Sequence, residues 1–297
     1  MKITFLGTSS SIPTKERNHS AFLLSYKTEN ILFDCGENVQ RQLTIAKISP
    51  AKITKILISH WHGDHVLGIP GLLTTIGNIS ADKIVEIYGP EGTKKQFEYV
   101  KKAFLTETIP KVKIIEIKKV GKFFENHDFC LDAQKLKHPI PCLAFSFIEK
   151  DKLRINKDKL KQLKIPKGPI IKDLTEGKNI KLNNKVIRYK EITYLQKGKK
   201  LTYLSNTGVS PSCIKAAKNA DVIISEATFS KADEKKAIEY QHLTSEQAAQ
   251  IAKKAKAKKL ILTHFSPRYK DTKDLEKEAK TIFKNTECAS DFISFSF

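Results

Sequence analysis

The stretch Lys55–Leu73, KILISHWHGDHVLGIPGLL, places three histidines and one aspartate within six residues. An apolar, β-branched run over 53–59 precedes them and predicts a buried strand that ends where they begin. Imidazole and carboxylate groups suit zinc and similar divalent ions. A single catalytic zinc with an open coordination position does not need four neighbouring ligands. The stretch therefore predicts a site in which two ions share His60, His62, Asp64 and His65. Such a site can activate a bridging water and polarise a phosphoryl or carbonyl oxygen.

Around this stretch, short strand-like runs alternate with amphipathic helical ones. Strands are predicted at 2–6, 21–26, 31–35, 53–59, 84–89, 111–117, 201–205, 221–225, 259–264 and 292–297. Helices are predicted at 37–48, 91–104, 210–220, 244–257 and 272–284, with Ser210 and Thr244 as caps and Gln247 at capping-box spacing. The alternation predicts α/β layers. The length allows one large domain or two small ones.

The charge balance points toward a polyanionic partner. Lysine and arginine number 53 against 32 acidic residues, which gives a net charge of +21. Nucleic acid is one such partner; a general lysine enrichment spread over solvated faces explains the charge equally well. Five unpaired cysteines in no C-x-x-C pattern indicate reduced, mostly buried thiols in a cytoplasmic protein. No apolar run is long enough for a membrane span, and the start has no secretory pattern.

H-x-H-x-D-H after a strand is the signature of the metallo-β-lactamase fold, and SHWHGDHVLGIPGLL resembles the version found in ribonuclease Z. FLGTSSSIPT (5–14), ILFDCGENVQRQL (31–43), LKHPIPCLAFSF (136–147), SEATFS (225–230), HLTSEQAA (242–249) and LILTHFSPRY (260–269) resemble further segments of that family, in its order. The resemblance spans nearly the whole chain and implies a single α/β domain over 1–297, folded as an αβ/βα sandwich. Its two mixed sheets face each other, and metals bind where strand ends from both halves meet.

The resemblance also implies the ligands, two zinc ions per subunit with manganese as an alternative. One ion is held by His60, His62 and His138, and the other by Asp64, His65 and His264. The family has an aspartate that bridges both ions where this chain has Asn206. A carboxamide offers one neutral oxygen, and its nitrogen cannot face a cation. We therefore expect weaker binding of at least one ion. The sequence leaves open whether this Asn is tolerated in the lineage or is an inactivating substitution.

The catalytic roles follow from the same resemblance. Asp64 is expected to act as general base toward the attacking water, and His242 to donate a proton from the other side. Glu226 is expected to orient His242. His19 and His127 have no companion pattern and are interpreted as structural or solvated residues.

A lysine-rich segment over 150–190 lacks the apolar periodicity of the rest, and we expect it to project as an insertion with little core of its own. GPIIKDLTEG (168–177) resembles the Gly-Pro motif of the arm by which ribonuclease Z grips tRNA, with Gly168, Pro169, Leu174 and Gly177 at matching spacing. Such an arm would contact phosphates and recognise shape rather than bases.

The resemblance implies an endoribonuclease that removes the 3′ trailer from precursor tRNA, acting as a homodimer in its short form. Hydrolysis would occur 3′ of the discriminator nucleotide. Two other functions remain open at this point. One is a hydrolase of small phosphodiesters or thioesters, which would have no use for the arm. The other is a non-catalytic tRNA-binding protein on the same scaffold, which Asn206 would favour.

Overall fold

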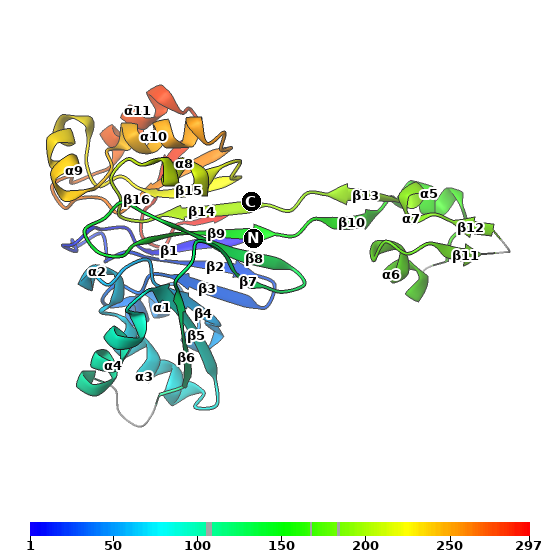
Figure 1. The fold of residues 1–297 in the computed structure, drawn as a ribbon, viewed down its shortest axis with the longest axis horizontal. Coiled ribbons are helices and arrows are strands. Elements are labelled where there is room, and N and C mark those ends of the chain that lie inside the picture. Colours follow the sequence, from blue (N-terminus) through cyan, green and yellow to red (C-terminus); the bar gives the residue numbers. More distant parts are fainter. Residues whose placement is uncertain (105–108, 167, 183–184) are drawn as a thin grey trace.

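The computed structural model describes residues 1–104, 109–166, 168–182 and 185–297. Within them, two seven-stranded sheets stack face to face, and helices cover the outer face of each (Figure 1). The first sheet has the order β18-β1-β2-β3-β4-β5-β6, and the second β17-β16-β15-β14-β9-β8-β7. This is the predicted αβ/βα sandwich of two mixed sheets, and that prediction is confirmed.

The first sheet is antiparallel around β1 and parallel from β3 onward. Its strands are β1 (Lys2–Gly7), β2 (Ala21–Tyr26), β3 (Glu29–Phe33), β4 (Lys55–Leu57), β5 (Ile84–Pro90), β6 (Lys111–Ile117) and β18 (Ser294–Ser296). Helices α1 (Val39–Ile45), α2 (Gly63–Val66), α3 (Ile69–Ile79) and α4 (Thr93–Phe104) and the 3₁₀ turn η1 (Pro50–Lys52) lie on this half.

The second sheet is parallel from β14 to β17 and antiparallel from β7 to β14. Its strands are β7 (Gly121–Glu125), β8 (Phe129–Lys135), β9 (Leu143–Glu149), β14 (Lys200–Leu204), β15 (Val222–Glu226), β16 (Lys259–Thr263) and β17 (Thr286–Cys288). Helices α8 (Pro211–Ala217), α9 (Glu234–Tyr240), α10 (Ser245–Lys254) and α11 (Lys273–Ile282) and the 3₁₀ turn η2 (Lys231–Asp233) lie on this half.

Aromatic side chains fill the space between the two sheets. Phe22 and Phe33 stack at 4.5 Å between ring centroids, and Tyr203 of the opposite sheet meets Phe22 edge-on at 5.1 Å. Phe145 and Phe147 of β9 are also fully buried there. Truncating one such ring to alanine costs about 3–5 kcal/mol. This core fixes one sheet against the other, and with it the two sets of strand ends.

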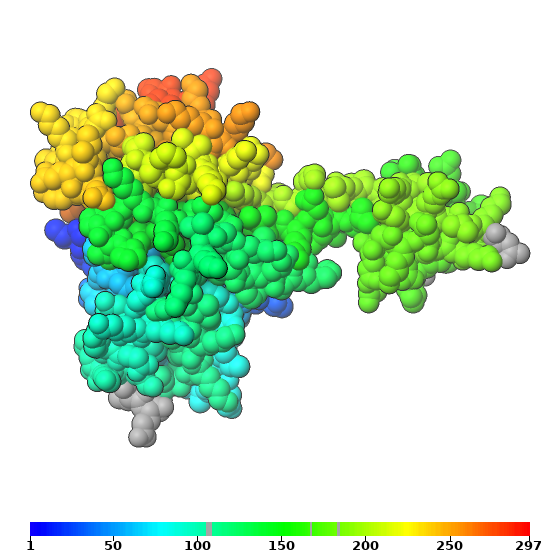
Figure 2. Space-filling model, viewed as in Figure 1, coloured from blue at the N-terminus to red at the C-terminus, as the bar shows by residue number. Residues whose placement is uncertain are grey.

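Residues 152–196 form an arm that projects from the body (Figures 1 and 2). Its stalk is the antiparallel pair β10 (Lys152–Ile155) and β13 (Thr193–Gln196), and its head contains α5 (Lys157–Gln162), α6 (Pro169–Thr175), β11 (Ile180–Leu182), β12 (Lys185–Ile187) and α7 (Tyr189–Ile192). The head has a small core of Ile165, Leu174, Ile180 and Ile192. This small cluster agrees with the expectation of little core. Its buried residues come from separate short segments, so no single element shows an apolar periodicity.

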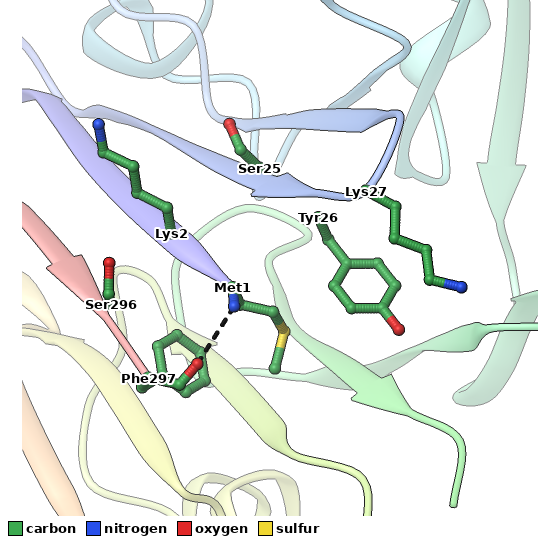
Figure 3. Close-up of a pocket in the computed structure, with 7 residues that line it drawn as sticks. All are labelled: Met1, Lys2, Ser25, Tyr26, Lys27, Ser296 and Phe297. Carbon is green, nitrogen blue, oxygen red and sulfur yellow. Dashed lines mark hydrogen bonds between the residues drawn. The ribbon is translucent and has the colours of Figure 1, made fainter. Parts of the chain in front are cut away.

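The first and last residues of the sequence lie side by side near the base of the arm (Figure 3). The Met1 amino group donates to the Phe297 carbonyl at 3.1 Å. Lys2, Ser25, Tyr26 and Lys27 line the shallow hollow beside them. This hollow lies away from the ligand histidines.

Most predicted elements appear, and the capping box at α10 is present, with the Thr244 side chain accepting from Gln247. Ser210 precedes α8 but makes no side-chain cap. Helix α3 was missed because Pro70, Gly71 and Gly77 obscure its apolar stripe. Among the described residues, no helix is long and apolar enough to cross a membrane.

Candidate metal centre

The ligand-type residues of the sequence converge at one edge of the sandwich. Asp34, His60, Asn206 and His264 each follow the carboxyl end of a strand, β3, β4, β14 or β16 respectively, and His138 lies in the loop from β8 to β9. The carboxyl ends of parallel strands meet at one edge, where α/β proteins commonly bind ligands. Three groups of potential ligands form there. We call His60, His62 and His138 the first ligand group and Asp64, His65 and His264 the second ligand group. The third, Glu226, His242 and His264, shares His264 with the second.

The segment that carries four of these ligands, which includes α2, is held tightly against the loop before α1. Gly68 ends this segment, and its N–H donates to the Cys35 carbonyl at 3.0 Å. A Cβ at Gly68 would lie 2.1 Å from the Gly36 carbonyl oxygen. Only glycine therefore allows this approach, which explains part of the GIPG sequence after the ligands.

In the first ligand group, three ring nitrogens converge. His62 Nδ1 lies 3.1 Å from His60 Nε2 and 3.3 Å from His138 Nε2. His60 is fully buried, whereas His62 and His138 are partly exposed. Burial lowers the pKa of all three, that of His138 to about 4. These side chains are therefore neutral at pH 7, as metal-ligating histidines must be.

In the second ligand group, a carboxylate joins two histidines. Asp64 Oδ2 lies 3.3 Å from His65 Nε2 and 3.4 Å from His264 Nε2, and the two Nε2 atoms are 3.3 Å apart. His264 adopts φ 61°, a left-handed conformation that is rare for a residue other than glycine and typical of functional sites.

Asp34 supports the second ligand group from behind. This fully buried carboxylate accepts from His65 Nδ1 at 2.8 Å, from the Tyr203 hydroxyl at 2.8 Å and from the Ser59 amide at 2.7 Å. A carboxylate on the outer nitrogen of a metal-ligating histidine fixes its tautomer and raises its basicity. The sequence placed Asp34 at a strand end but gave no sign of this role, because only the pairing of β3 with β4 brings it to His65.

The hydrogen bonds around the site leave lone pairs facing one another. The Thr228 hydroxyl donates to Glu226 at 2.6 Å, so it accepts from His264 Nδ1 at 2.8 Å. His65 Nδ1 donates to Asp34. In these neutral tautomers, assigned from the network, both Nε2 atoms carry lone pairs 3.3 Å apart. Only a proton or a cation between them relieves this repulsion.

The pKa shifts in the second ligand group also favour a proton or a cation at this position. Burial disfavours a charged His65, but Asp64 and Asp34 outweigh it and raise its pKa to about 10. Burial alone would raise the pKa of Asp64, yet His65 and His264 hold it well below its usual range. The group thus keeps its carboxylate ionised and takes up a proton, and a divalent ion would displace that proton. The donor set fits a metal.

Asn206 is buried beside the first ligand group. Its Nδ2 is 3.4 Å from His60 Nε2, whereas its Oδ1 has no hydrogen-bond partner. Turning the carboxamide by 180° exchanges these atoms and brings the unpartnered oxygen toward His60, as a bound cation requires. The residue can then supply one neutral oxygen, and the second carboxylate expected of a two-ion site is absent.

Beside the ligands, Glu226 and His242 form a buried ion pair. His242 Nδ1 lies 3.0 Å from Glu226 Oε2, and Glu226 is fully buried at the end of β15. Burial lowers the pKa of His242, but the Glu226 carboxylate outweighs it, and the net shift is upward. Burial raises the pKa of Glu226, but the interaction with His242 outweighs this effect, and the net shift is downward. Thr228, which the sequence analysis did not single out, connects Glu226 to His264.

Comparison with known proteins decides the family. Residues 1–138 match the family model described as anti-Pycsar protein Apyc1, and residues 187–265 match the β-lactamase superfamily domain. A Bacillus mycoides protein named ribonuclease Z is 41% identical over 303 residues, which cover 99% of each chain. The chain belongs to the ribonuclease Z family. A Bacillus cereus ribonuclease Z is 40% identical over the same shares. The crystal structure of human tRNase Z, short form, is 29% identical with a TM-score of 0.72, covering 100% of this chain and 99% of that one.

The resemblance to ribonuclease Z and to the metallo-β-lactamase fold is thus confirmed. Together with the histidine and aspartate clusters, the ribonuclease Z fold indicates a metal-binding protein.

The remaining predicted positions are distributed as follows. Gly168 and Gly177 flank α6 with φ of 150° and 81°, and Pro169 is the first residue of that helix. Leu174 is fully buried in the head of the arm, so its side chain does not face a substrate, contrary to expectation. His19 is buried, 3.2 Å from the Ser11 carbonyl, and His127 is exposed.

Proposed function

We propose that this chain is a metal-dependent endoribonuclease that removes the 3′ trailer from precursor tRNA by hydrolysing the phosphodiester 3′ of the discriminator nucleotide. The observation that carries the proposal is the convergence of two ligand groups at one strand edge, in a chain 41% identical to a ribonuclease Z over 99% of its length. We further propose a cytoplasmic homodimer with two zinc ions per subunit, for which manganese can substitute.

The two ligand groups, together with Asn206, would hold the ions. When bound, the ions would activate a water and neutralise charge developing on the phosphate. Asp64 Oδ2 lies within 3.4 Å of both histidines of its group. Oδ1 is then available to accept a proton from the attacking water. The carboxylate thus both orients and deprotonates the nucleophile.

His242 would supply the proton to the leaving 3′ oxygen. Glu226 accepts from Nδ1, so Nε2 is the nitrogen available to the substrate. The raised pKa of His242 keeps a fraction of the ring protonated near neutral pH, as a general acid requires. Thr228 would keep Glu226 in place.

The arm would bind the folded part of the tRNA. Its lysines supply phosphate contacts that position an RNA without reading its sequence. Gly168, Pro169 and Gly177 would shape the arm at α6. The arm leaves the body at the amino end of β14, whereas Asn206 follows the carboxyl end of the same strand. The arm and the site thus lie at opposite ends of this strand. The arm of one subunit could then serve the site of its partner, which supports a homodimer.

The first test is cleavage of a precursor tRNA by this chain and by Asn206→Asp, side by side in zinc or manganese. We expect the Asp variant to cut faster, since it restores a second carboxylate. Equal cleavage rates would contradict the expectation that Asn206 bridges the two ions more weakly than an aspartate does. If neither chain cuts but both bind the precursor, the chain is a tRNA-binding protein instead.

A second test separates precursor tRNA from small phosphodiesters. Leu153 and Leu195 are partners across the stalk, so residues 154–194 can be replaced by a two-residue Asn-Gly turn. We expect this variant to lose precursor cleavage and to retain hydrolysis of bis(4-nitrophenyl) phosphate. Unimpaired cleavage of the precursor by this variant would show that the arm is not needed to bind the tRNA.

A further inference from the structure

Two cavities border the candidate metal centre on different sides. One, of about 270 Å³, is lined by His138 and the residues that follow it, Pro139, Ile140 and Pro141. The other, of about 410 Å³, is lined by His242 and residues of α9 and α10. The His138 and His242 rings are 5.7 Å apart between centroids. An extended strand that runs from one cavity to the other therefore passes both rings.

We propose that the cavity beside His138 binds the base of the first trailer nucleotide, the one immediately 3′ of the cleaved phosphodiester. This subsite rests on the proposed function and deepens it. It assigns a binding role to the loop between β8 and β9 beyond its single ligand, His138.

The lining of this cavity suits a base. Buried Ile117 and Leu143 form apolar walls together with Pro90, and Ile140 and Pro141 complete them. Apolar side chains can pack against the faces of a base that is turned out of its stack. Among the lining residues, the charged ones are Lys118, Lys135 and Glu91, all exposed. The two lysines are available to the phosphates on either side of a bound nucleotide.

The size of the cavity limits what can enter. A volume of about 270 Å³ lies below the roughly 300–1,000 Å³ of drug-sized ligand sites. It therefore admits one base of an unpaired strand and excludes a base-paired stem. The walls offer few fixed hydrogen-bonding groups, so binding should depend on the presence of a base and little on its identity.

The position of His242 gives the direction of the strand. The leaving group is the 3′ oxygen of the retained nucleotide, and its proton donor His242 lines the second cavity. The retained nucleotide accordingly lies toward His242. The nucleotide on the other side of the phosphate, which begins the trailer, lies toward His138.

The test uses the full chain with zinc and a precursor tRNA whose cleavage linkage is a non-hydrolysable methylene phosphonate. One RNA carries a normal first trailer nucleotide, and a second carries an abasic residue there. The dissociation constants are compared. We expect the abasic RNA to bind roughly tenfold more weakly, since losing the apolar contacts of one base has an effect of this order.

Ile140→Asp tests the cavity itself, and Ile140→Val keeps it apolar. Ile140 is half-buried, so both variants should fold. We expect Ile140→Asp to bring the two constants within twofold of each other and Ile140→Val to keep the difference. Ile84→Asp is the matched control, because Ile84 is exposed at the opposite end of β5 from Pro90.

Equal binding of the two RNAs by the unmodified chain, or a difference that survives Ile140→Asp, would overturn the subsite. Failure of the proposed function would be distinct: an ordinary precursor would be neither bound nor cut, and the subsite would fail with it.

Discussion

The two ligand groups lie side by side but differ in charge and in support. The first contains only neutral histidines, two of them partly exposed, and its nearest additional ligand is the neutral Asn206. The second contains Asp64, has Asp34 directly behind it, and is buried almost completely. A divalent cation gains more from ionised, preorganised ligands than from neutral ones. We infer that the second ligand group binds the tighter ion and that the first depends on its bridge.

Removing one histidine from each group tests this comparison most strongly. His65→Ala should weaken the tightest zinc binding by more than about 100-fold, beyond the range for losing an outer partner of a ligand. His62→Ala should leave that binding event almost unchanged and weaken only the second one. Competition with a chromophoric chelator measures both steps. Equal losses in the two variants would show that the groups do not differ.

Asp34→Asn tests whether the support behind the second group matters. We expect a loss of about 10–100-fold in the tight zinc affinity, because His65 loses the carboxylate that fixes its tautomer. Tyr203→Phe removes another hydrogen bond to the same carboxylate and is the milder control. If Asp34→Asn binds zinc as the unmodified chain does, the buried carboxylate has only a packing role.

Asn206→Asp should reduce the difference in metal affinity between the two ligand groups. The added charge should tighten the weaker ion by about tenfold or more, from the attraction of one more charge at contact distance. Metal analysis after dialysis should show a rise from nearer one to nearer two ions per chain. No gain over the unmodified chain would mean that the carboxamide already bridges fully. Asn206→Ala is the matched control, and equal metal content of the Asp and Ala variants would mean that residue 206 does not hold an ion.

The support of the second group extends to Asp291, which gives the smallest predicted effect. Asp291 accepts from Thr8 and from the Asn18 amide, and Thr8 in turn accepts from the Phe265 amide next to His264. Burial raises the pKa of Asp291 from 3.8 to about 6. Its contribution to stability is thus fully present below about pH 4 and is lost as pH rises through 6, by up to about 3 kcal/mol.

Asp291→Asn removes this titration. Denaturant unfolding between pH 4 and 7 should therefore show a smaller decline of the unfolding free energy in the variant than in the unmodified chain. Parallel curves would show that Asp291 does not titrate in this range.

The sequence predicted the parts of the site that are close together in the chain or carry a family motif. Six histidine and aspartate positions proposed as metal ligands came from such motifs, and their side chains cluster in the structure. Asp34 and Thr228 were not identified, because hydrogen bonds to ligands depend on strand pairing and on rotamers. The apolar wall beside His138 was not predicted either, since the ends of β5, β6 and β8 meet there only in the folded sheets.

Prediction of the fold from the sequence was limited in the same way. The apolar runs predicted β1 to β6, β14 to β16 and β18, whereas β7, β8, β9 and β17 were missed. Polar residues interrupt β7 and β8, and β17 has only three residues. The core of the arm escaped detection because its four buried residues come from separate short segments.

The stalk of the arm has a consequence for how such enzymes diversify. Two paired strands are the only covalent links between the body and a head that has its own apolar core. Under the proposed function, changes in the head would alter which RNA is captured without disturbing the proposed ligands beyond the carboxyl end of β14. Mutations near the ligands can in turn tune hydrolysis without altering capture. Selection can act on the two properties separately, and a different head could be grafted at Leu153 and Leu195.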